Sequence, residues 1–227
     1  MLQYHYLHSD NASIKRGDLQ TLINIVICKM FRSYLLVVSI FVFLFQVSLV
    51  FSSRGVDISQ ASTIAAFQCL KSKGYDWAVI RVYGKFSIID AYIFPCFSCG
   101  NGAGQVEAMV KYIHSYKTNV DMVWFDIEGP GVYWSSDQSK NRDFFNSMLA
   151  GAKSAGVKVG VYTSESQWEP IMGSWTGGAD YPLWYAHYDN NPSFSDFVPF
   201  GGWKKPHAKQ YEGSVSDCGI GVDLNYY

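Results

Sequence analysis

The sequence has little charge, and neither sign predominates. Among its 227 residues, 18 Lys and Arg stand against 19 Asp and Glu, which gives a formal net charge of -1. Domains that bind nucleic acid carry a basic patch or stripe, so this composition argues against a nucleic-acid partner. Charged residues make up only 16% of the chain and apolar residues 48%, a balance that excludes intrinsic disorder and a long coiled coil.

The chain also lacks internal repeats, low-complexity tracts and interdomain linkers. Its length fits one domain of barrel or α/β type, or two small domains. Aromatic residues are abundant, because 7 Trp, 16 Tyr and 15 Phe make up 17% of the sequence. We therefore expect one sizeable hydrophobic core, with aromatic side chains enough for a binding groove as well.

One long uncharged segment stands near the N-terminus. Residues 34–51 contain no charged side chain and only three polar ones. Arg32 precedes this run and two serines follow it, a pattern typical of a secretory signal peptide; a short membrane anchor is the alternative. Because a signal peptide lies near the start of a protein, we expect residues 30–53 to be the signal and residues 1–29 to be a spurious or alternative extension.

Cleavage after the signal would leave residues 54–227 as a single domain. Export predicts that this domain is secreted or enters a lysosomal or phagosomal lumen, without stable membrane association, and we expect it to be monomeric. The mature part has 174 residues with 14 basic and 17 acidic side chains, so its net charge is -3.

Four cysteines remain in the mature chain: Cys69, Cys96, Cys99 and Cys218. An even number in an oxidising compartment predicts two disulfides, for which the sequence leaves three pairings open. The Cys96-x-x-Cys99 spacing also suits a redox or zinc pair, but no second pair follows at metal-ligand spacing. Export therefore favours structural bonds.

Short runs of β-branched and aromatic residues recur along the mature chain and predict strands. Eight such runs lie at residues 55–59, 77–84, 91–98, 122–129, 158–164, 182–189, 207–213 and 221–227. Eight strands suit a closed barrel. Helical patterns lie between several of them, over 106–113 and over 144–152 before a stop at Gly156. Alternating strands and helices indicate parallel β/α units.

The connections shorten toward the C-terminus. The segment between Tyr188 and His207 is rich in Pro and Gly, and only seven residues separate Gly213 from Gly221. A parallel crossover needs about a dozen residues or more, so the last strands should lack helices and one pair should run antiparallel. The mature chain is also shorter than the roughly 250 residues of a full (β/α)8 barrel. A truncated TIM-like α/β barrel fits both facts.

Four carboxylates stand where they can meet. Asp126 and Glu128 lie two residues apart at the C-terminal end of a predicted strand, so both side chains leave the same face, about 6.6 Å apart. Asp57 is in the first strand and Asp223 in the last, and these strands are neighbours in a closed barrel. The C-terminal ends of the strands form the active site of β/α barrels. As an alternative, Asp126 and Glu128 cap a loop or pair with Arg81 or Lys85.

Clustered carboxylates suit a particular chemistry. Repulsion and burial raise some carboxyl pKa values, so one group can donate a proton at neutral pH while its neighbours stay ionised. Glycoside hydrolysis requires this arrangement. Aromatic residues near strand ends are candidates to stack on sugar rings, with core packing as the alternative role. They are Tyr83, Tyr162, Trp184, Tyr185 and Tyr188.

Six motifs in unbroken order resemble glycoside hydrolase family 25, the muramidases or lysozymes of fungal and phage-lysin type. They are Gly55-Val-Asp-Ile-Ser-Gln60, Phe125-Asp-Ile-Glu128, Tyr162-Thr-Ser164, Leu183-Trp-Tyr-Ala-His-Tyr188, Lys209-Gln-Tyr211 and Gly221-Val-Asp-Leu-Asn225. The resemblance implies a (β/α)5(β)3 barrel. It also implies hydrolysis of the β-1,4 bond between N-acetylmuramic acid and N-acetylglucosamine in bacterial peptidoglycan, with no metal or other cofactor.

The resemblance assigns roles to individual residues. Glu128 matches the proton donor, and Asp126 matches its partner, which orients the substrate acetamido group or stabilises positive charge. Asp57 and Asp223 match two flanking acids. Substrate-binding candidates are Tyr162, Trp184 and Gln210, which lie in groove motifs, together with Tyr83. Three routes stay open: a protein nucleophile, the substrate's acetamido oxygen, or inversion by water.

One alternative concerns the function. The domain could instead be a catalytically silent carbohydrate-binding or immune-recognition module on the same barrel, because a fold alone does not guarantee chemistry. Retention of all four acids favours the enzyme. The histidines His114, His187 and His207 show no metal-ligand spacing, so we interpret them as packing or surface residues.

Overall fold

The computed structural model describes residues 53–80 and 88–227. The expected extension and signal peptide lie outside the described residues, as do Tyr83, Arg81 and Lys85. The segment Ser52–Tyr227 forms one compact unit. Within the described ranges, no helix is both long and apolar enough to cross a membrane.

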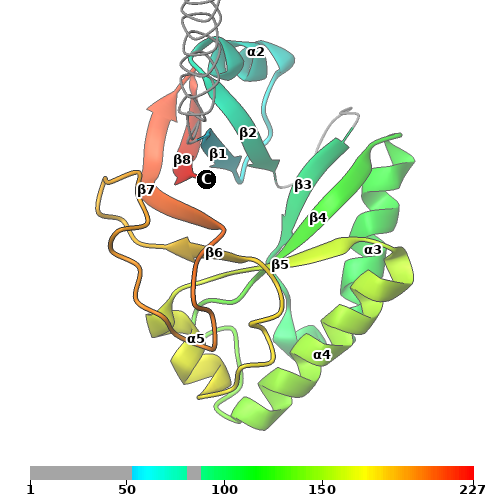
Figure 1. The fold of residues 1–227 in the computed structure, drawn as a ribbon. Helices are drawn as coiled ribbons and strands as arrows, with labels where there is room; N and C mark the ends of the chain where they lie inside the picture. Colours follow the sequence, from blue (N-terminus) through cyan, green and yellow to red (C-terminus); the bar gives the residue numbers. More distant parts are fainter. Residues whose placement is uncertain (1–52, 81–87) are drawn as a thin grey trace, which may run out of the picture. The chain divides into compact units, whose positions relative to one another are not determined.

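Eight strands close into a barrel in sequence order (Figure 1). They are β1 (Arg54–Ile58), β2 (Tyr75–Ile80), β3 (Ile88–Ile93), β4 (Asn119–Asp126), β5 (Lys158–Thr163), β6 (Leu183–Ala186), β7 (Ala208–Asp217) and β8 (Ile220–Tyr226). Neighbouring strands from β1 to β7 are parallel. Strand β8 runs antiparallel to both β7 and β1. The α/β barrel and its antiparallel closing pair are thus confirmed.

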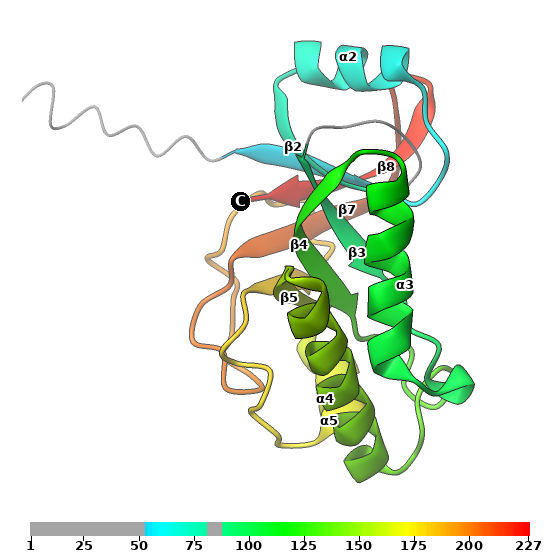
Figure 2. The same cartoon turned by 90° about the vertical axis from the view of Figure 1, so that its right-hand side faces the viewer.

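The α-helices of the described residues lie on the outside of the barrel, and each follows a strand (Figure 2). They are α2 (Ile64–Ser72) after β1, α3 (Gly102–Ser115) after β3, α4 (Gln138–Ala155) after β4 and α5 (Glu165–Met172) after β5. A short 3-10 helix, η1 (Phe97–Cys99), precedes α3. The residues that join β2 to β3 lie outside the described ranges, and the β6–β7 connection contains no helix. The helix-free end expected from the short connections is therefore present.

Local sequence fixes the ends of the longest helix. The Asp137 side chain accepts hydrogen bonds from the backbone N–H groups of Ser139 and Lys140 at the start of α4. Gly156 ends the helix in the left-handed region, at φ 71°, which glycine adopts without steric cost. The predicted stop at Gly156 is confirmed.

Alternation along the strands separates two cores. Trp124, Tyr162 and Trp184 point into the barrel, where they pack against Val79 and Ala208. The next residue of each strand points outward, so Phe125 packs against the helices instead. Because Asp126 is the residue after Phe125, its side chain again points into the barrel. The period of two along the strand therefore places this carboxylate at the barrel mouth.

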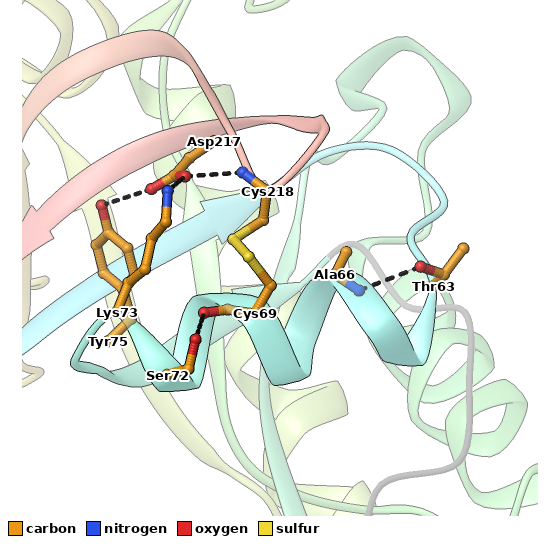
Figure 3. The surroundings of a disulfide bond; sticks show 8 residues. All are labelled: Thr63, Ala66, Cys69, Ser72, Lys73, Tyr75, Asp217 and Cys218. Atoms are coloured by element: carbon orange, nitrogen blue, oxygen red, sulfur yellow. Dashed lines mark hydrogen bonds and ion pairs between the residues drawn. A yellow bond between two sulfur atoms is a disulfide. The ribbon is translucent and has the colours of Figure 1, made fainter.

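Two disulfides answer the question of cysteine pairing. Cys69 of α2 bonds to Cys218 in the turn between β7 and β8 (Figure 3). Cys96 bonds to Cys99 within the β3–α3 connection. Beside the first bond, Asp217 pairs with Lys73 and accepts a hydrogen bond from the Tyr75 hydroxyl at 3.2 Å. The long-range bond therefore ties the first helix to the last hairpin.

Loss of the long-range disulfide is expected to lower the free energy of unfolding by about 2–5 kcal/mol, because the unfolded chain gains freedom. The bond joins residues 149 positions apart. The measurement is urea unfolding of a Cys69→Ala, Cys218→Ala double variant. A Cys96→Ala, Cys99→Ala variant is the control, since its bond spans 3 positions and should contribute less. Equal losses in the two variants would contradict this account.

Candidate active site

A pocket of about 170 Å³ opens at the C-terminal ends of the strands. The structure brings all four predicted acids together in it, with three of the predicted substrate-binding residues. Its lining is Asp57, Ser59, Tyr92, Asp126, Glu128, Tyr162, Trp184, Tyr188, Gln210 and Asp223. Tyr83, the remaining candidate, lies outside the described residues. The sequence thus located the pocket, and the roles of its residues stay predictions.

Register explains how distant residues meet. Asp126, Tyr162 and Trp184 are aligned partners on β4, β5 and β6, so their side chains share the inner face. On the other side of the barrel, Asp57 of β1 is aligned with Asp223 of β8. Closure of the barrel brings these two groups to one mouth.

The two β4 carboxyls have different environments. Asp126 ends the strand and is buried, whereas Glu128 is partly exposed at the mouth. The backbone between them is fixed, because the Ile127 N–H donates to the Tyr162 carbonyl at 2.9 Å and the Thr163 hydroxyl donates to the Ile127 carbonyl at 2.7 Å. Burial raises the pKa of Glu128 above its usual range. That carboxyl therefore keeps its proton to higher pH than a free glutamic acid.

The surroundings of the Asp57 carboxyl shift its pKa strongly. Its Oδ2 accepts hydrogen bonds from Asn225 Nδ2 at 2.7 Å and Gln210 Nε2 at 2.8 Å. Burial and the charge of the neighbouring Asp223 raise the pKa of Asp57 to about 7, although the two amide donors act in the opposite direction. At neutral pH this carboxyl is therefore partly protonated.

Gln210 links the acids to the aromatic wall. Its Nε2 donates to Asp57 and, at 3.2 Å, to Asp223 Oδ2. Its Oε1 accepts from the hydroxyl of Tyr162 at 2.6 Å and from that of Tyr188 at 2.7 Å. The Gln210 amide therefore orients two carboxylates and two phenols. Its own orientation is fixed because the Nε2 group, the donor, must face the carboxylates, and the Oε1 atom, the acceptor, must face the phenol hydroxyls.

Not every aromatic candidate reaches the pocket. Tyr188 lies at the mouth with 59% of its surface exposed. Tyr185 points out of the barrel and donates to Asp196 at 3.0 Å, so its proposed sugar-binding role is wrong. The period of two along β6 explains this, because its neighbour Trp184 points inward.

Sequence reasoning missed Asn225, Tyr92 and Ser59. Asn225 binds Asp57 and accepts from the Trp184 indole N–H at 2.7 Å. A signal for it existed, because Asn225 lies two residues after Asp223 in the closing motif and so occupies the same strand face.

The loop that carries Tyr188 is held from outside the barrel by Lys209. This side chain is fully buried, and its Nζ lies 2.7 Å from Asp189 Oδ2 and 2.8 Å from Asp196 Oδ1. Two adjacent residues of β7 thus bind two adjacent residues of the loop. Lys209 binds Asp189 on the outside of the barrel, and Gln210 binds Tyr188 on the inside.

His187 also belongs to this group, with Nδ1 at 2.6 Å from Asp196 Oδ2. Its ring and the two carboxylates offer atoms within 4.8 Å of one another, a grouping that the sequence spacing did not reveal. The Lys209 ammonium already supplies the positive charge that both carboxylates bind.

Removal of this buried cation should loosen the loop. A Lys209→Met variant removes the buried ammonium that both carboxylates bind, which is expected to lower the free energy of unfolding by about 3 kcal/mol. Amide hydrogen exchange over residues 187–196 should rise. The matched control is Lys158→Met, whose pair with Asp121 is exposed and should contribute under about 1 kcal/mol. Similar effects of both variants would contradict the anchoring role.

Asp57 should impose a pH dependence on stability. Its pKa is raised from 3.8 to about 7, so between these pH values the folded chain holds a proton that the unfolded chain has released. The free energy of unfolding should therefore fall as pH rises, by up to about 1.4 kcal/mol per pH unit from this group. The Asp57→Asn variant should flatten that slope in urea unfolding. An unchanged slope would contradict the buried, protonated acid.

Comparisons with known proteins agree with the motifs. A family model described as Lysozyme-like protein 1 matches residues 85–211. Probable GH family 25 lysozyme 2 of Dictyostelium discoideum is 53% identical over 215 residues, which cover 86% of this chain and 99% of that protein.

Solved structures share the fold. The family GH25 lysozyme from Aspergillus fumigatus matches with a TM-score of 0.57 at 18% identity, over 78% of this chain and 93% of that chain. The modular Cpl-1 endolysin, complexed with a peptidoglycan analogue, matches with a TM-score of 0.53 at 17% identity, over 77% of this chain and 54% of that chain. At such identities the likeness concerns the barrel alone. With the sequence relative, the motifs and the barrel in agreement, the chain belongs to glycoside hydrolase family 25.

Proposed function

We propose that this protein is a lysozyme that hydrolyses the β-1,4 bond between N-acetylmuramic acid and N-acetylglucosamine in bacterial peptidoglycan. The observation that carries the proposal is the convergence of Asp57, Asp126, Glu128 and Asp223 in one pocket at the barrel mouth. The names of the family 25 relatives support it, as does the peptidoglycan analogue bound by the similarly folded endolysin.

Glu128 is the proposed proton donor. It lies at the pocket opening, and burial raises its pKa, so it can hold a proton for the leaving glycosidic oxygen. Asp126 lies deeper on the same strand face. Its proposed role is to stabilise the positive charge that develops on the sugar ring, or to orient the acetamido group.

The remaining residues hold and complete the site. Asp57 and Asp223, linked through Gln210, supply the flanking acids and fix the amide that orients Tyr162 and Tyr188. The exposed ring of Tyr188 offers a face for a sugar at the mouth, while the buried Trp184 forms part of the pocket wall.

The Glu128→Gln variant tests the proposed donor. It keeps the shape of the side chain without the acid, so the rate of clearing of a bacterial cell-wall suspension should fall by about 10²- to 10⁴-fold. The urea unfolding midpoint should stay near that of wild type. Glu107→Gln, which changes an exposed glutamate on α3, is the control and should clear the suspension normally.

Two outcomes would count against this account. Wild-type clearing by Glu128→Gln would remove the donor assignment. A wild-type protein that binds peptidoglycan but releases no reducing ends would instead support the silent recognition module.

A further inference from the structure

A second hollow lies on the same end of the barrel as the acid pocket. This aromatic groove, of about 400 Å³, runs between residues 94–98 of the β3–α3 connection and residues 132–135 of the β4–α4 connection. Phe94, Val132 and Tyr133 remain exposed there, with 36%, 75% and 53% of their surfaces accessible. Exposed apolar groups gathered in a hollow mark a binding surface more often than isolated ones do.

Both walls of the aromatic groove are fixed before any ligand arrives. In the first wall, the Cys96 N–H donates to Gln105 Oε1 at 2.9 Å, and Gln105 Nε2 donates to the Cys96 carbonyl at 2.8 Å. The Cys96–Cys99 disulfide lies beside these bonds. In the second, the Asn141 side chain binds the Ser135 N–H and carbonyl at 3.1 and 2.8 Å. Such preorganisation lowers the entropy cost of binding.

The rings of Phe94 and Tyr133 meet across the aromatic groove. They pack edge to face with centroids 5.0 Å apart. Phe97 and the buried Trp134, which also line the groove, form a second aromatic pair with centroids 5.9 Å apart. The rings of Phe94 and Tyr133 therefore support each other and keep apolar surface exposed to solvent.

The aromatic groove adjoins the acid pocket in sequence after both β3 and β4. Tyr92 lines the acid pocket, and Phe94, two residues later, lines the aromatic groove. Glu128 lines the acid pocket, and its neighbour Gly129 supports Tyr133, whose N–H donates to the Gly129 carbonyl at 3.0 Å.

Glycine is required at position 129 for this contact. A Cβ there would lie 2.3 Å from Cδ2 of Tyr133, and the residue has a φ of +77°. The Tyr133 ring is thus seated directly on the residue that follows the proposed proton donor.

We propose that the aromatic groove is a sugar subsite, which binds a further ring of the same glycan strand whose scissile bond lies at Glu128. This rests on the proposed function. The lining, residues 94–98 and 132–135, contains no charged side chain. An uncharged aromatic surface suits the C–H face of a pyranose and does not suit the charged peptide stem of peptidoglycan. Phe94 and Tyr133 are therefore proposed to set affinity for longer strands.

Binding to the inactive Glu128→Gln protein tests the subsite apart from catalysis. The probes are peptide-free oligosaccharides of alternating N-acetylglucosamine and N-acetylmuramic acid, graded in length and titrated by calorimetry. In this background, Tyr133→Ala and Phe94→Ala should each weaken binding of the long members by about tenfold. The shortest member that binds should lose much less, because it does not extend into the aromatic groove.

Controls separate the subsite from general aromatic or folding effects. Tyr112 and Tyr116 form another exposed edge-to-face pair, with centroids 5.2 Å apart, on α3. Their alanine variants should leave every affinity unchanged. Tyr133→Phe keeps the ring and should bind the long glycans as tightly as the protein with Tyr133. A role of Tyr133 in folding would instead appear as a lowered urea unfolding midpoint in Tyr133→Ala and not in Phe94→Ala.

The outcomes are distinct. A loss that does not depend on glycan length, or no loss in either variant, would overturn the subsite. Peptide-bearing strands of the same lengths are titrated in parallel, and a loss of affinity seen only with them would overturn the subsite in favour of binding of the peptide stem. If wild type cleaves no glycan but the length-dependent loss is present, the proposed function fails and the subsite stands.

Discussion

The antiparallel pairing of β8 with β1 closes the barrel and sets Asp57 opposite Asp223. These acids come from the first and last strands of the barrel, and only closure makes them neighbours. Strand β8 also pairs with β7, which brings Gln210 opposite Asn225. Both amides donate to Asp57. The long-range disulfide joins α2 to the β7–β8 turn, so it restrains the same closing hairpin.

The acid pair has an energetic cost that its neighbours offset. Burial and the nearby charge of Asp223 favour the neutral form of Asp57, while the amide donors favour the ionised form. Burial acts in the same direction on the phenol of Tyr162, whose pKa is raised well above its usual value, so it remains a donor to Gln210. A network of this kind orients polar groups in a low-dielectric site, where hydrogen bonds are strong and unsatisfied groups are costly.

The sequence predicted those features that follow from strand period and barrel closure. Asp126 and Glu128 were located by their spacing, and Asp57 with Asp223 by the rule that first and last strands meet. The helix stop at Gly156 followed from glycine's backbone freedom. Each of these depends on local geometry or on one topological rule.

Features that depend on side-chain packing could not be predicted in the same way. Tyr185 and Tyr188 looked alike in sequence, yet one lies outside the barrel and the other at its mouth. Lys209 stands beside Gln210 in one motif, and only the path of the β6–β7 loop reveals that it is a buried anchor. Cysteine pairing likewise required knowing which distant segments meet.

The most direct test of the central claim is mass spectrometry of the fragments that the wild-type protein releases from purified peptidoglycan. Cleavage as proposed creates a new reducing end on N-acetylmuramic acid, because the bond broken is the one between its C1 and the next N-acetylglucosamine. Muropeptides that end in reducing N-acetylmuramic acid are the predicted result. Fragments that end in reducing N-acetylglucosamine, or no soluble fragments at all, would contradict it.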